Sequence, residues 1–467
     1  MRYVSTRGET PALGFREAVL AGLAGDGGLY VPGSWPQLTY EEISRFAGQS
    51  YPAVASEIIR LFAGNEIAPT ALRSMIDEAY ASFRHPAVTP LVQVAPNHFL
   101  LELFHGPTLA FKDVAMQVLA RLMDHMLAER DERATVVGAT SGDTGGAAIE
   151  AFRGRERIDI AILFPEGRVS PVQRRQMTTA RERSVQAIAI KGTFDDAQAL
   201  VKGMFNDPRF RQRVHLSGVN SINWGRIVAQ IVYYFVAAVA LGAPHRAVSF
   251  TVPTGNFGNI FAGYAARRMG LPIERLVIAT NVNDILHRTL LTGRYEVRGV
   301  TATSSPSMDI QVSSNFERLL FEIEDRDPTA VRRLMAGLVQ SGAYTLAASA
   351  RQKLAADFAS GAASEVDTAS TIARLKERAG IVIDPHTAVG IAVAERHLGS
   401  TPMITMATAH PAKFPDAVEA ACGVRPELPD WARSILSAKE DYRVVPAELD
   451  KVEQAIESRL RIHEAVG

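Results

Sequence analysis

One lysine of this chain stands in a setting that suits covalent chemistry. Lys112 follows Leu109, Ala110 and Phe111, and only Asp113 separates it from a second apolar run. Burial in such surroundings disfavours the charged ammonium and lowers a lysine pKa, so the neutral amine becomes available to form a Schiff base with an aldehyde. Because most lysines are solvated surface residues, this apolar setting is what marks Lys112 as a candidate nucleophile.

Two loops rich in glycine have compositions that suit anion binding. The loop over residues 253–259 joins a β-rich run to a helical pattern, and residues 255–259 could hold a phosphate with backbone amides. This loop matches neither the P-loop nor the dinucleotide fingerprint. The loop over residues 140–146 also joins a strand to a helix and could bind a substrate carboxylate. A tight turn with self-capping side chains explains the composition of that second loop equally well.

A phosphate loop and a Schiff-base lysine in one chain indicate pyridoxal phosphate as the cofactor. Both loops lie at strand-to-helix junctions, and ligands of open α/β sheets bind at the carboxyl ends of the strands. The sheet is predicted to be parallel because, from Phe99 onward, short β-rich runs alternate with amphipathic helices. The predicted strands lie at residues 135–137, 158–164, 185–190, 248–252, 276–279 and 403–406.

The composition excludes several other classes of protein. The chain has 467 residues, 47% of them apolar and 21% charged, so it is neither disordered nor fibrous and is long enough for two or three packed units. Its 50 basic and 50 acidic residues balance, and we therefore expect no nucleic-acid partner. Cys422 is the only cysteine, so an intrachain disulfide is impossible, no metal site is expected, and a cytoplasmic location fits best.

Local patterns make further predictions about single elements. The first residues lack the apolar stretch of an export signal, and we expect no membrane segment. The apolar run over residues 227–243 is interrupted by Gln230 and is predicted to be a buried core helix. Thr193 and Asp196 are spaced as a capping box that opens a helix through Phe205. Residues 359–364 are predicted to form an exposed turn within a mainly helical stretch over residues 325–380.

The segment over residues 105–113 resembles the pyridoxal-lysine segment of the threonine synthases, a family in the tryptophan synthase β-like group of pyridoxal enzymes. Further segments resemble the family in the same order along the chain: residues 3–8, 139–145, 221–224, 255–258, 279–284 and 409–414. Thr254 stands where the family often has serine, and Gly146 where alanine is common. Neither departure removes a required functional group. No such resemblance extends over the final fifty or so residues.

The resemblance implies a fold and a division of the chain. The fold class is α/β of the tryptophan synthase β-like type, with two parallel-sheet units and a helical N-terminal segment. The implied parts are a mainly helical segment over residues 1–95, a large cofactor-binding domain over residues 96–134 and 226–425, a smaller inserted domain over residues 135–225, and a C-terminal tail over residues 426–467. The active site is expected in the cleft between the two α/β units.

The resemblance also implies an activity, the conversion of O-phospho-L-homoserine and water into L-threonine and phosphate, the last step of threonine biosynthesis. Lys112 would join the cofactor as a Schiff base and then act as the proton carrier. A Thr408 hydroxyl at the pyridine nitrogen would make the ring a weaker electron sink than a carboxylate partner would. The expected cofactor-binding residues are Phe111, Lys112, Asp143, Gly255, Asn256, Phe257, Gly258, Asn259 and Thr408. The expected substrate-binding residues are Thr140, Ser141, Thr144, Asn223, Arg226 and Lys413.

Two alternatives from other functional classes stay open at this point. A threonine or serine deaminase of the same fold would need no pocket for a leaving phosphate, and a non-catalytic pyridoxal-binding protein would turn nothing over. His105, His386 and His410 are left out of the catalytic set because a lone histidine is more often a hydrogen-bonded structural residue. The chain is expected to act on a small-molecule substrate as a monomer or homodimer.

Overall fold

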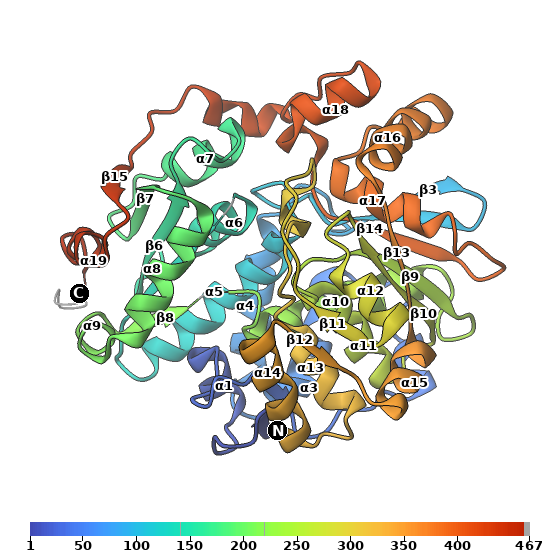
Figure 1. The fold of residues 1–467 in the computed structure, drawn as a ribbon, viewed down its shortest axis with the longest axis horizontal. Helices are drawn as coiled ribbons and strands as arrows, with labels where there is room; N and C mark the ends of the chain where they lie inside the picture. Colours follow the sequence, from blue (N-terminus) through green and yellow to red (C-terminus); the bar gives the residue numbers. More distant parts are fainter. Residues whose placement is uncertain (141, 219, 462–467) are drawn as a thin grey trace.

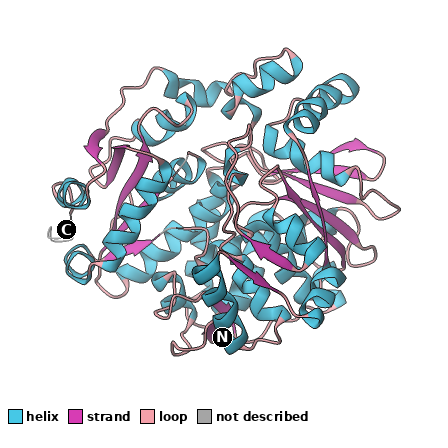
Figure 2. Ribbon diagram, in the orientation of Figure 1, coloured by secondary structure: helices cyan, strands magenta, loops and turns pink. Residues whose placement is uncertain are grey.

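The computed structural model describes residues 1–140, 142–218 and 220–461, and within these residues the two larger sheets lie in two lobes (Figure 1). The sheet of the large lobe has the strand order β13-β10-β9-β14-β4-β3, and that of the small lobe has the order β15-β7-β6-β5-β8. Figure 2 shows the two groups of strands apart from each other, with helices around both. The fold is therefore α/β with two sheet units, as the sequence predicts.

In the large sheet, β4, β14, β9, β10 and β13 run parallel, and β3 pairs antiparallel with β4 at the edge. Helices cover both faces, and β9 and β14 are buried along their whole length, including the polar side chains of Ser249, Thr251 and Thr405. The strands of the large sheet are β3 (Leu91–Ala95), β4 (His98–Glu102), β9 (Val248–Pro253), β10 (Ile273–Thr280), β13 (Phe358–Ala362) and β14 (Met403–Ala407).

The apolar run over residues 227–243 forms most of α10 (Trp224–Ala240), a buried helix at the centre of the large lobe. It packs against α3, α5 and α11, which confirms the predicted core helix. No helix in the described part of the chain combines the length and the apolar character that a membrane crossing requires. The helices packed around the large sheet are α5 (Lys112–Ala128), α11 (Gly258–Arg268), α16 (Glu365–Ala379), α17 (Pro385–Ala394) and α18 (Pro415–Cys422).

The small sheet is parallel throughout. The Thr193 side chain accepts a hydrogen bond from the Asp196 amide and the Asp196 carboxylate accepts one from the Thr193 amide, so the predicted capping box opens α8. The small lobe holds β5 (Ala134–Ala139), α6 (Asp143–Phe152), β6 (Ile158–Pro165), α7 (Pro171–Thr178), β7 (Val185–Lys191), α8 (Phe194–Asn206), α9 (Pro208–Val214) and β8 (Leu216–Gly218).

The N-terminal part and a peripheral helical part pack against the large lobe. The N-terminal part holds β1 (Tyr3–Ser5), α1 (Phe15–Ala21), β2 (Tyr30–Pro32), α2 (Tyr40–Ser44), α3 (Tyr51–Ala63) and α4 (Pro69–Ala81). The peripheral part holds α12 (Ile285–Thr292), β11 (Arg294–Glu296), η1 (Pro306–Met308), α13 (Phe316–Ile323), α14 (Pro328–Ser341), β12 (Ala343–Thr345) and α15 (Ala348–Asp357).

The predicted exposed turn at residues 359–364 is wrong. Residues Phe358–Ala362 form β13, which pairs with β10 at the edge of the large sheet. A Cβ on Gly361 would lie 2.8 Å from Val393 Cγ1, so the small residues of this strand let α17 pack closely against it. The glycine, alanine and serine that read as a turn are instead the consequence of this close packing.

The C-terminal segment, expected to be a tail, packs against the small lobe. After α18 the chain passes along η3 (Asp430–Leu436) to the small lobe, where β15 (Arg443–Pro446) adds a parallel edge strand to β7 and α19 (Leu449–Glu457) packs against α8 (Figure 1). We call residues 423–442 the C-terminal crossing. Arg174 on α7 holds it through a bidentate pair with Glu440, at 2.9 and 3.0 Å. The final residues of the fold therefore belong to the small lobe.

Candidate active site

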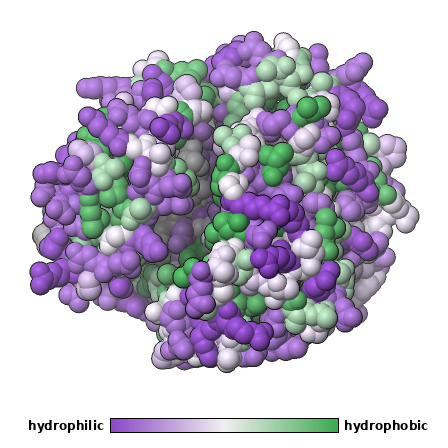
Figure 3. All heavy atoms as spheres, viewed as in Figure 1, coloured by the Kyte–Doolittle hydropathy of each residue, from purple (hydrophilic) through white to green (hydrophobic). Residues whose placement is uncertain are grey.

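The candidate residues gather at the carboxyl ends of strands from both sheets. The loop that leads to Lys112 follows β4, the loop over residues 254–259 follows β9, and Thr408 follows β14, while Asp143 begins α6 shortly after β5. Figure 3 shows a deep groove between the two lobes. Lys112 of the large lobe and Asp143 of the small lobe meet in the interior, as their ion pair and burial show. The candidate site is thus built from both lobes.

Lys112 is the first residue of α5 and is held on a rigid mount. The Phe111 amide donates to the Thr408 carbonyl at 2.8 Å, and Ala110 bridges to Ala409. Behind Lys112, the buried Asp113 carboxylate accepts hydrogen bonds from the amide and hydroxyl of Thr108 at 2.8 and 2.7 Å. Burial raises the pKa of Asp113 to about 6, and the Thr108 bonds oppose that rise. The backbone on both sides of Lys112 is therefore fixed by hydrogen bonds.

The charge on Lys112 is weakened by its surroundings. Its side chain is only 10% exposed, and Nζ lies 3.7 Å from Asp143 Oδ2. Burial lowers the pKa of Lys112 to about 8, the Asp143 carboxylate opposes this, and the cations of Lys413 and Arg226 reinforce it. About a tenth of the amine is then neutral at pH 7, whereas an ordinary lysine is neutral in fewer than about one molecule in a thousand. The neutral amine is the form that attacks an aldehyde.

Asp143 is held as an anion between several donors. Lys413 Nζ lies 2.8 Å from Oδ1, and Gln173 Nε2 donates to the same oxygen at 2.9 Å. Burial alone would raise the pKa of Asp143, but the ammonium groups of Lys413 and Lys112 and the Gln173 amide overcome this and hold it well below its usual range. Oδ2 is left to face Lys112.

The loop over residues 255–259 has the form of a phosphate cradle. Among the described residues no acceptor is recorded for the backbone amides of residues 255–259. Phe257 has a φ of 64°, which turns the chain into α11. A Cβ on Gly255 would lie 2.6 Å from the Ser307 carbonyl oxygen, so only glycine fits beneath that neighbouring loop. Free amides at a helix N-terminus suit the phosphate of pyridoxal phosphate.

Asn259, the last residue of this loop, carries a side-chain donor that the fold does not use. The Tyr233 hydroxyl donates to Asn259 Oδ1 at 2.7 Å, and the Tyr234 hydroxyl is within 3.1 Å of the same oxygen and 2.9 Å of the backbone carbonyl. Asn259 Nδ2 is buried and has no partner among the described residues. Because the tyrosine hydroxyls contact Oδ1, the NH₂ group is the part of the side chain that remains able to bind a ligand.

A second loop, which carries Ser307 and Ser313, closes over the cradle. From the sequence alone, Asn281 and Asn283 could either brace the cofactor loops or form a simple turn. Ser313 Oγ donates to the Gly255 carbonyl at 2.6 Å. Asn281 and Asn283 both donate to Asp309 Oδ1, at 2.8 and 2.9 Å, and so fix the turn that carries Ser307. The asparagines after β10 were visible in the sequence, but their partners lie more than twenty positions away. Only the fold brings them together.

Arg226 is a buried cation without a counterion in the described part of the chain. It lies near the start of α10, is 2% exposed, and has two nitrogens, Nε and Nη1, with no hydrogen-bond partner. Burial lowers the pKa of Arg226 to about 10. An unpaired buried guanidinium costs free energy, and such groups are retained where an anionic ligand completes them. Its charge also helps to lower the pKa of Lys112, after burial and the charge of Lys413.

The structure assigns other contacts to several residues expected to bind substrate. Asn223 caps α10 by accepting from the Gly225 amide at 2.9 Å and donates to the Val19 carbonyl at 2.8 Å, so both ends of its side chain are used within the fold. Thr140 Oγ1 accepts from the amides of Gly142 and Gly145, both at 2.9 Å. Self-capping of this turn is therefore real. Ser141 lies outside the described residues.

The remaining expected residues lie in the segments that follow β4, β14 and β5. Phe111 precedes it, and Lys112 Nζ lies 5.5 Å from the centroid of that ring. Thr408 is buried at the end of β14, and Thr144 lies in the first turn of α6. Gly142 has a φ of 148°, and a Cβ there would lie 2.4 Å from Gln173 Cδ, which explains the glycine in this loop.

The three histidines have structural partners. His386 lies 2.9 Å from Asp384 through Nδ1 and accepts from the Ser307 amide through Nε2 at 3.2 Å. His105 pairs with Glu102 at 2.7 Å. His410 Nδ1 accepts from the Ala412 amide, and burial lowers the pKa of His410 to about 4. These contacts account for each ring without a catalytic role.

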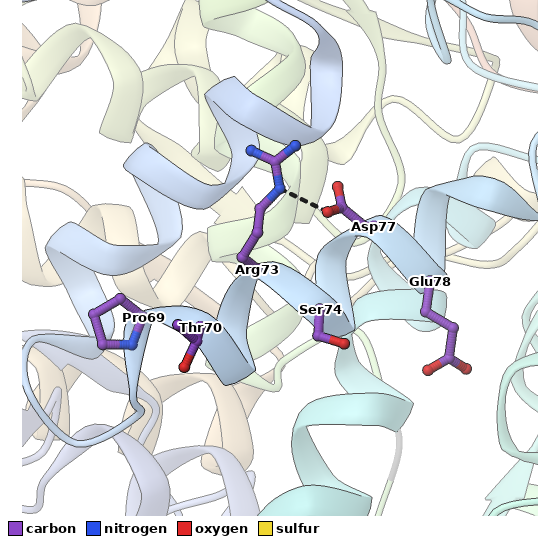
Figure 4. Close-up of a pocket in the computed structure, with 6 residues that line it drawn as sticks. All are labelled: Pro69, Thr70, Arg73, Ser74, Asp77 and Glu78. Carbon is purple, nitrogen blue, oxygen red and sulfur yellow. Dashed lines mark hydrogen bonds and ion pairs between the residues drawn. The ribbon is translucent and has the colours of Figure 1, made fainter.

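A shallow depression elsewhere on the surface differs from this site in kind. It lies along the outer side of α4, where Arg73 and Asp77 form an exposed pair at 2.7 Å (Figure 4). Such i,i+4 pairs are ordinary on helix surfaces. The depression is lined by Pro69, Thr70, Arg73, Ser74, Asp77 and Glu78.

Comparisons with known proteins agree with this geometry. Residues 2–80 match the family model for the threonine synthase N terminus, residues 83–406 match that for pyridoxal-phosphate dependent enzymes, and residues 387–456 match that for the threonine synthase C-terminal region. The chain is 51% identical to the threonine synthase of Pseudomonas aeruginosa over 456 residues, 97% of each protein.

Solved structures give the same result. The crystal structure of threonine synthase from Brucella melitensis with bound pyridoxal phosphate is 60% identical, with a TM-score of 0.97 and coverage of 99% of this chain and 100% of that one. The structure of yeast threonine synthase is 40% identical, with a TM-score of 0.93 and coverage of 98% of both chains. The similarity thus extends over the whole length of these relatives.

Proposed function

The chain belongs to the threonine synthase family of pyridoxal-phosphate-dependent enzymes, and from this premise we propose that it converts O-phospho-L-homoserine and water into L-threonine and phosphate. The observation that carries the proposal is the combination around Lys112: a cradle of free amides for one phosphate and, in addition, the unpaired guanidinium of Arg226. A deaminase of this fold would need no cation for a second phosphate. In enzyme terms the reaction is that of a carbon–oxygen lyase acting on a phosphate.

The residues present fit pyridoxal phosphate. The amides of residues 255–259 and the Asn259 Nδ2 group would hold its phosphate, Lys112 would form the Schiff base, and Thr408 would offer a hydroxyl to the ring nitrogen. When bound, the cofactor supplies the aldehyde that joins an amine and the ring that withdraws electrons from the substrate's Cα. Phe111 and Asp143 would flank it.

The chain's own side chains then divide the remaining tasks. Once the substrate amine has displaced it, the Lys112 amine takes and returns protons at Cα, Cβ and Cγ. Arg226 receives the departing γ-phosphate with charge-assisted hydrogen bonds. Thr144, and the hydroxyl hydrogen that Thr140 keeps while its oxygen caps the turn, hold the substrate carboxylate at the start of α6, where the helix dipole favours an anion. Water adds at Cβ after phosphate has left.

One assay tests the proposal against both alternatives. The purified protein, loaded with pyridoxal phosphate, is given O-phospho-L-homoserine, and phosphate and threonine are measured over time. We expect equal amounts of the two products. Formation of a keto acid from L-threonine, without phosphate release from the other substrate, would instead identify a deaminase. An absorbance change without any product would identify a protein that binds the cofactor but does not use it.

We also propose that the protein works in the cytoplasm as a monomer or homodimer. A single cysteine and balanced charge are consistent with that setting. Size-exclusion chromatography with light scattering measures the assembly, and a tetramer or larger species would contradict this part of the proposal.

The lowered pKa of Lys112 makes a prediction about pH. The neutral amine captures the aldehyde, so below a pKa of about 8 the rate of cofactor uptake by the apoprotein rises about tenfold per pH unit and then levels off above pH 8. Asp143, Lys413 and Arg226 are the charged groups that set this midpoint. Stopped-flow absorbance from pH 6 to 10 measures it. A rate that keeps rising to pH 10 would show an ordinary, solvated lysine.

We expect the affinity for pyridoxal phosphate to fall when Asn259 or its contact with Tyr233 is removed. Asn259→Leu raises the dissociation constant of pyridoxal phosphate by about tenfold, because one buried hydrogen bond to a phosphate disappears. Tyr233→Phe raises it less, by freeing the amide to rotate. Tyr264→Phe is a matched control on the same helix as Asn259, since Tyr264 makes no hydrogen bond to Asn259. Fluorescence titration of the apoprotein measures all three, and equal effects of the two tyrosine changes would contradict the orienting role.

A further inference from the structure

We propose that Lys413 is a positioning residue that holds the Asp143 carboxylate toward Lys112 across the two lobes, and that it does not bind the substrate's phosphate. Because it concerns the same reaction, this role rests on the proposed function. Sequence reasoning placed Lys413 among the phosphate-binding candidates because it is a lysine near the cofactor loops. The contacts of its ammonium group lead to a different role.

The ammonium of Lys413 is fully used within the protein. A lysine side chain has three N–H donors and no acceptor. Nζ lies 2.7 Å from the Thr108 carbonyl, 2.8 Å from Asp143 Oδ1 and 3.0 Å from Gln176 Oε1. The side chain is 0% exposed. A substrate phosphate could reach it only by breaking one of these three contacts, whereas the donors of Arg226 are free for that task.

These contacts join the two lobes at the reacting centre. Lys413 ends η2 (Pro411–Lys413), which follows β14 of the large lobe. Asp143 begins α6 and Gln176 lies on α7, both in the small lobe. Gln176 Nε2 also donates to the Thr108 carbonyl at 2.9 Å, so the same peptide receives a bond from each lobe. Lys413 therefore ties the loop that carries Lys112 to the lobe that carries Asp143.

The pair also fixes which oxygen of Asp143 faces Lys112. Lys413 and Gln173 both occupy Oδ1, and Oδ2 is the oxygen 3.7 Å from Lys112 Nζ. Without Lys413 the carboxylate has no second cation, and it would pair with Lys112 alone. The pKa of Lys112 would then rise, because the Asp143 carboxylate would interact with Lys112 alone and the repulsion from the Lys413 ammonium would be lost. The charge of Lys413 also acts on Asp113 and His410, where it favours a lower pKa.

The decisive variant is Lys413→Met, which keeps the length of the side chain and removes its charge. The pH midpoint for capture of pyridoxal phosphate by the apoprotein should move up by about one unit, followed by absorbance. In the loaded enzyme, kcat falls about tenfold or more while KM for O-phospho-L-homoserine changes less than about threefold. A KM raised tenfold or more with an unmoved midpoint would overturn the proposal and restore the phosphate role.

Two further variants keep the test decisive if Lys413→Met does not fold. The double variant Lys413→Met/Asp143→Asn removes both charges, and its capture midpoint should return to within about half a unit of the wild-type value. Gln176→Leu is the matched control, since it removes one contact of Lys413 and leaves every charge in place, and its midpoint should not move. A double variant that stays shifted, or a control that shifts equally, would contradict the role.

Failure of the proposed function can be told apart from failure of this inference. Cofactor capture requires no substrate, so the midpoints remain measurable if O-phospho-L-homoserine is not turned over. A wild-type protein that binds pyridoxal phosphate but releases no phosphate would remove the proposed reaction and leave the midpoints to decide the role of Lys413.

Discussion

Replacing Lys112 by alanine lowers the rate of threonine formation by about 10⁴-fold. The change removes the amine that joins the cofactor and the group that carries protons at the substrate's carbons, and proton transfer alone is typically worth 10²–10⁴-fold. The fold should survive, because Asp143 keeps Lys413 as its partner at 2.8 Å. Initial rates of phosphate release measure the loss, and circular dichroism checks the fold. A decrease of less than tenfold would mean that another group does this chemistry.

Reductive trapping locates the amine directly. Borohydride treatment of the loaded wild-type protein, followed by peptide mapping, should find the pyridoxyl label on Lys112. The same treatment of Lys112→Ala should leave the chain unlabelled, and Lys413→Met should still carry the label. A label on Lys413, the other lysine buried at this site, would exchange the roles argued for the two residues.

Replacing Arg226 by methionine should move catalysis and stability in opposite directions. We expect kcat/KM for O-phospho-L-homoserine to fall by about 10²–10³-fold, since loss of a buried charged partner of an anion costs several kcal/mol. We expect the apoprotein to melt at a higher temperature, because a buried guanidinium with two unpartnered nitrogens is replaced by an apolar side chain of similar length. Both effects have one cause. Arg226 has no counterion within the described part of the protein, so its charge costs stability in the apoprotein and is available to bind the substrate's phosphate.

Arg318 supplies the matched control. It is equally buried, but its guanidinium donates to the carbonyls of Tyr30 and Ile222 and to the Asn315 side chain. Arg318→Met leaves those acceptors unsatisfied and should lower the melting temperature. Calorimetry of the two apoprotein variants compares them directly. If Arg226→Met also melts lower, or if its kcat/KM for O-phospho-L-homoserine is unchanged, Arg226 is an ordinary structural arginine.

Features that depend on neighbours in the sequence were predictable. The runs at residues 248–252 and 403–406 are confirmed as β9 and β14, and the Thr193 capping box opens α8, because alternation and capping act over a few residues. The Lys112 segment and the loop over residues 255–259 could likewise be found from their composition. What those segments meet could not be found in this way.

The parts that escaped prediction depend on tertiary packing. Lys413 and the Thr108 carbonyl are 305 positions apart, and nothing near either residue indicates that the lysine's donors are used up inside the protein. The prediction of a turn at β13 is wrong because the small residues of this strand allow α17 to pack closely against it and do not indicate a flexible loop. Arg226 was a candidate by its charge, but its lack of a counterion is a property of the fold alone. Sequence patterns indicate where helices and strands lie, but they do not show which distant residues pair with one another in hydrogen bonds and ion pairs.

The edge strand β15 has a consequence for how the chain is made. Residues 443–446 emerge from the ribosome long after β7, their partner at residues 185–191. At ordinary rates of synthesis the backbone edge of β7 therefore waits uncovered for on the order of tens of seconds. A nascent chain with an unpaired strand edge can pair with a neighbouring chain on the same polysome. The late addition of β15 covers that edge and so protects the chain against aggregation.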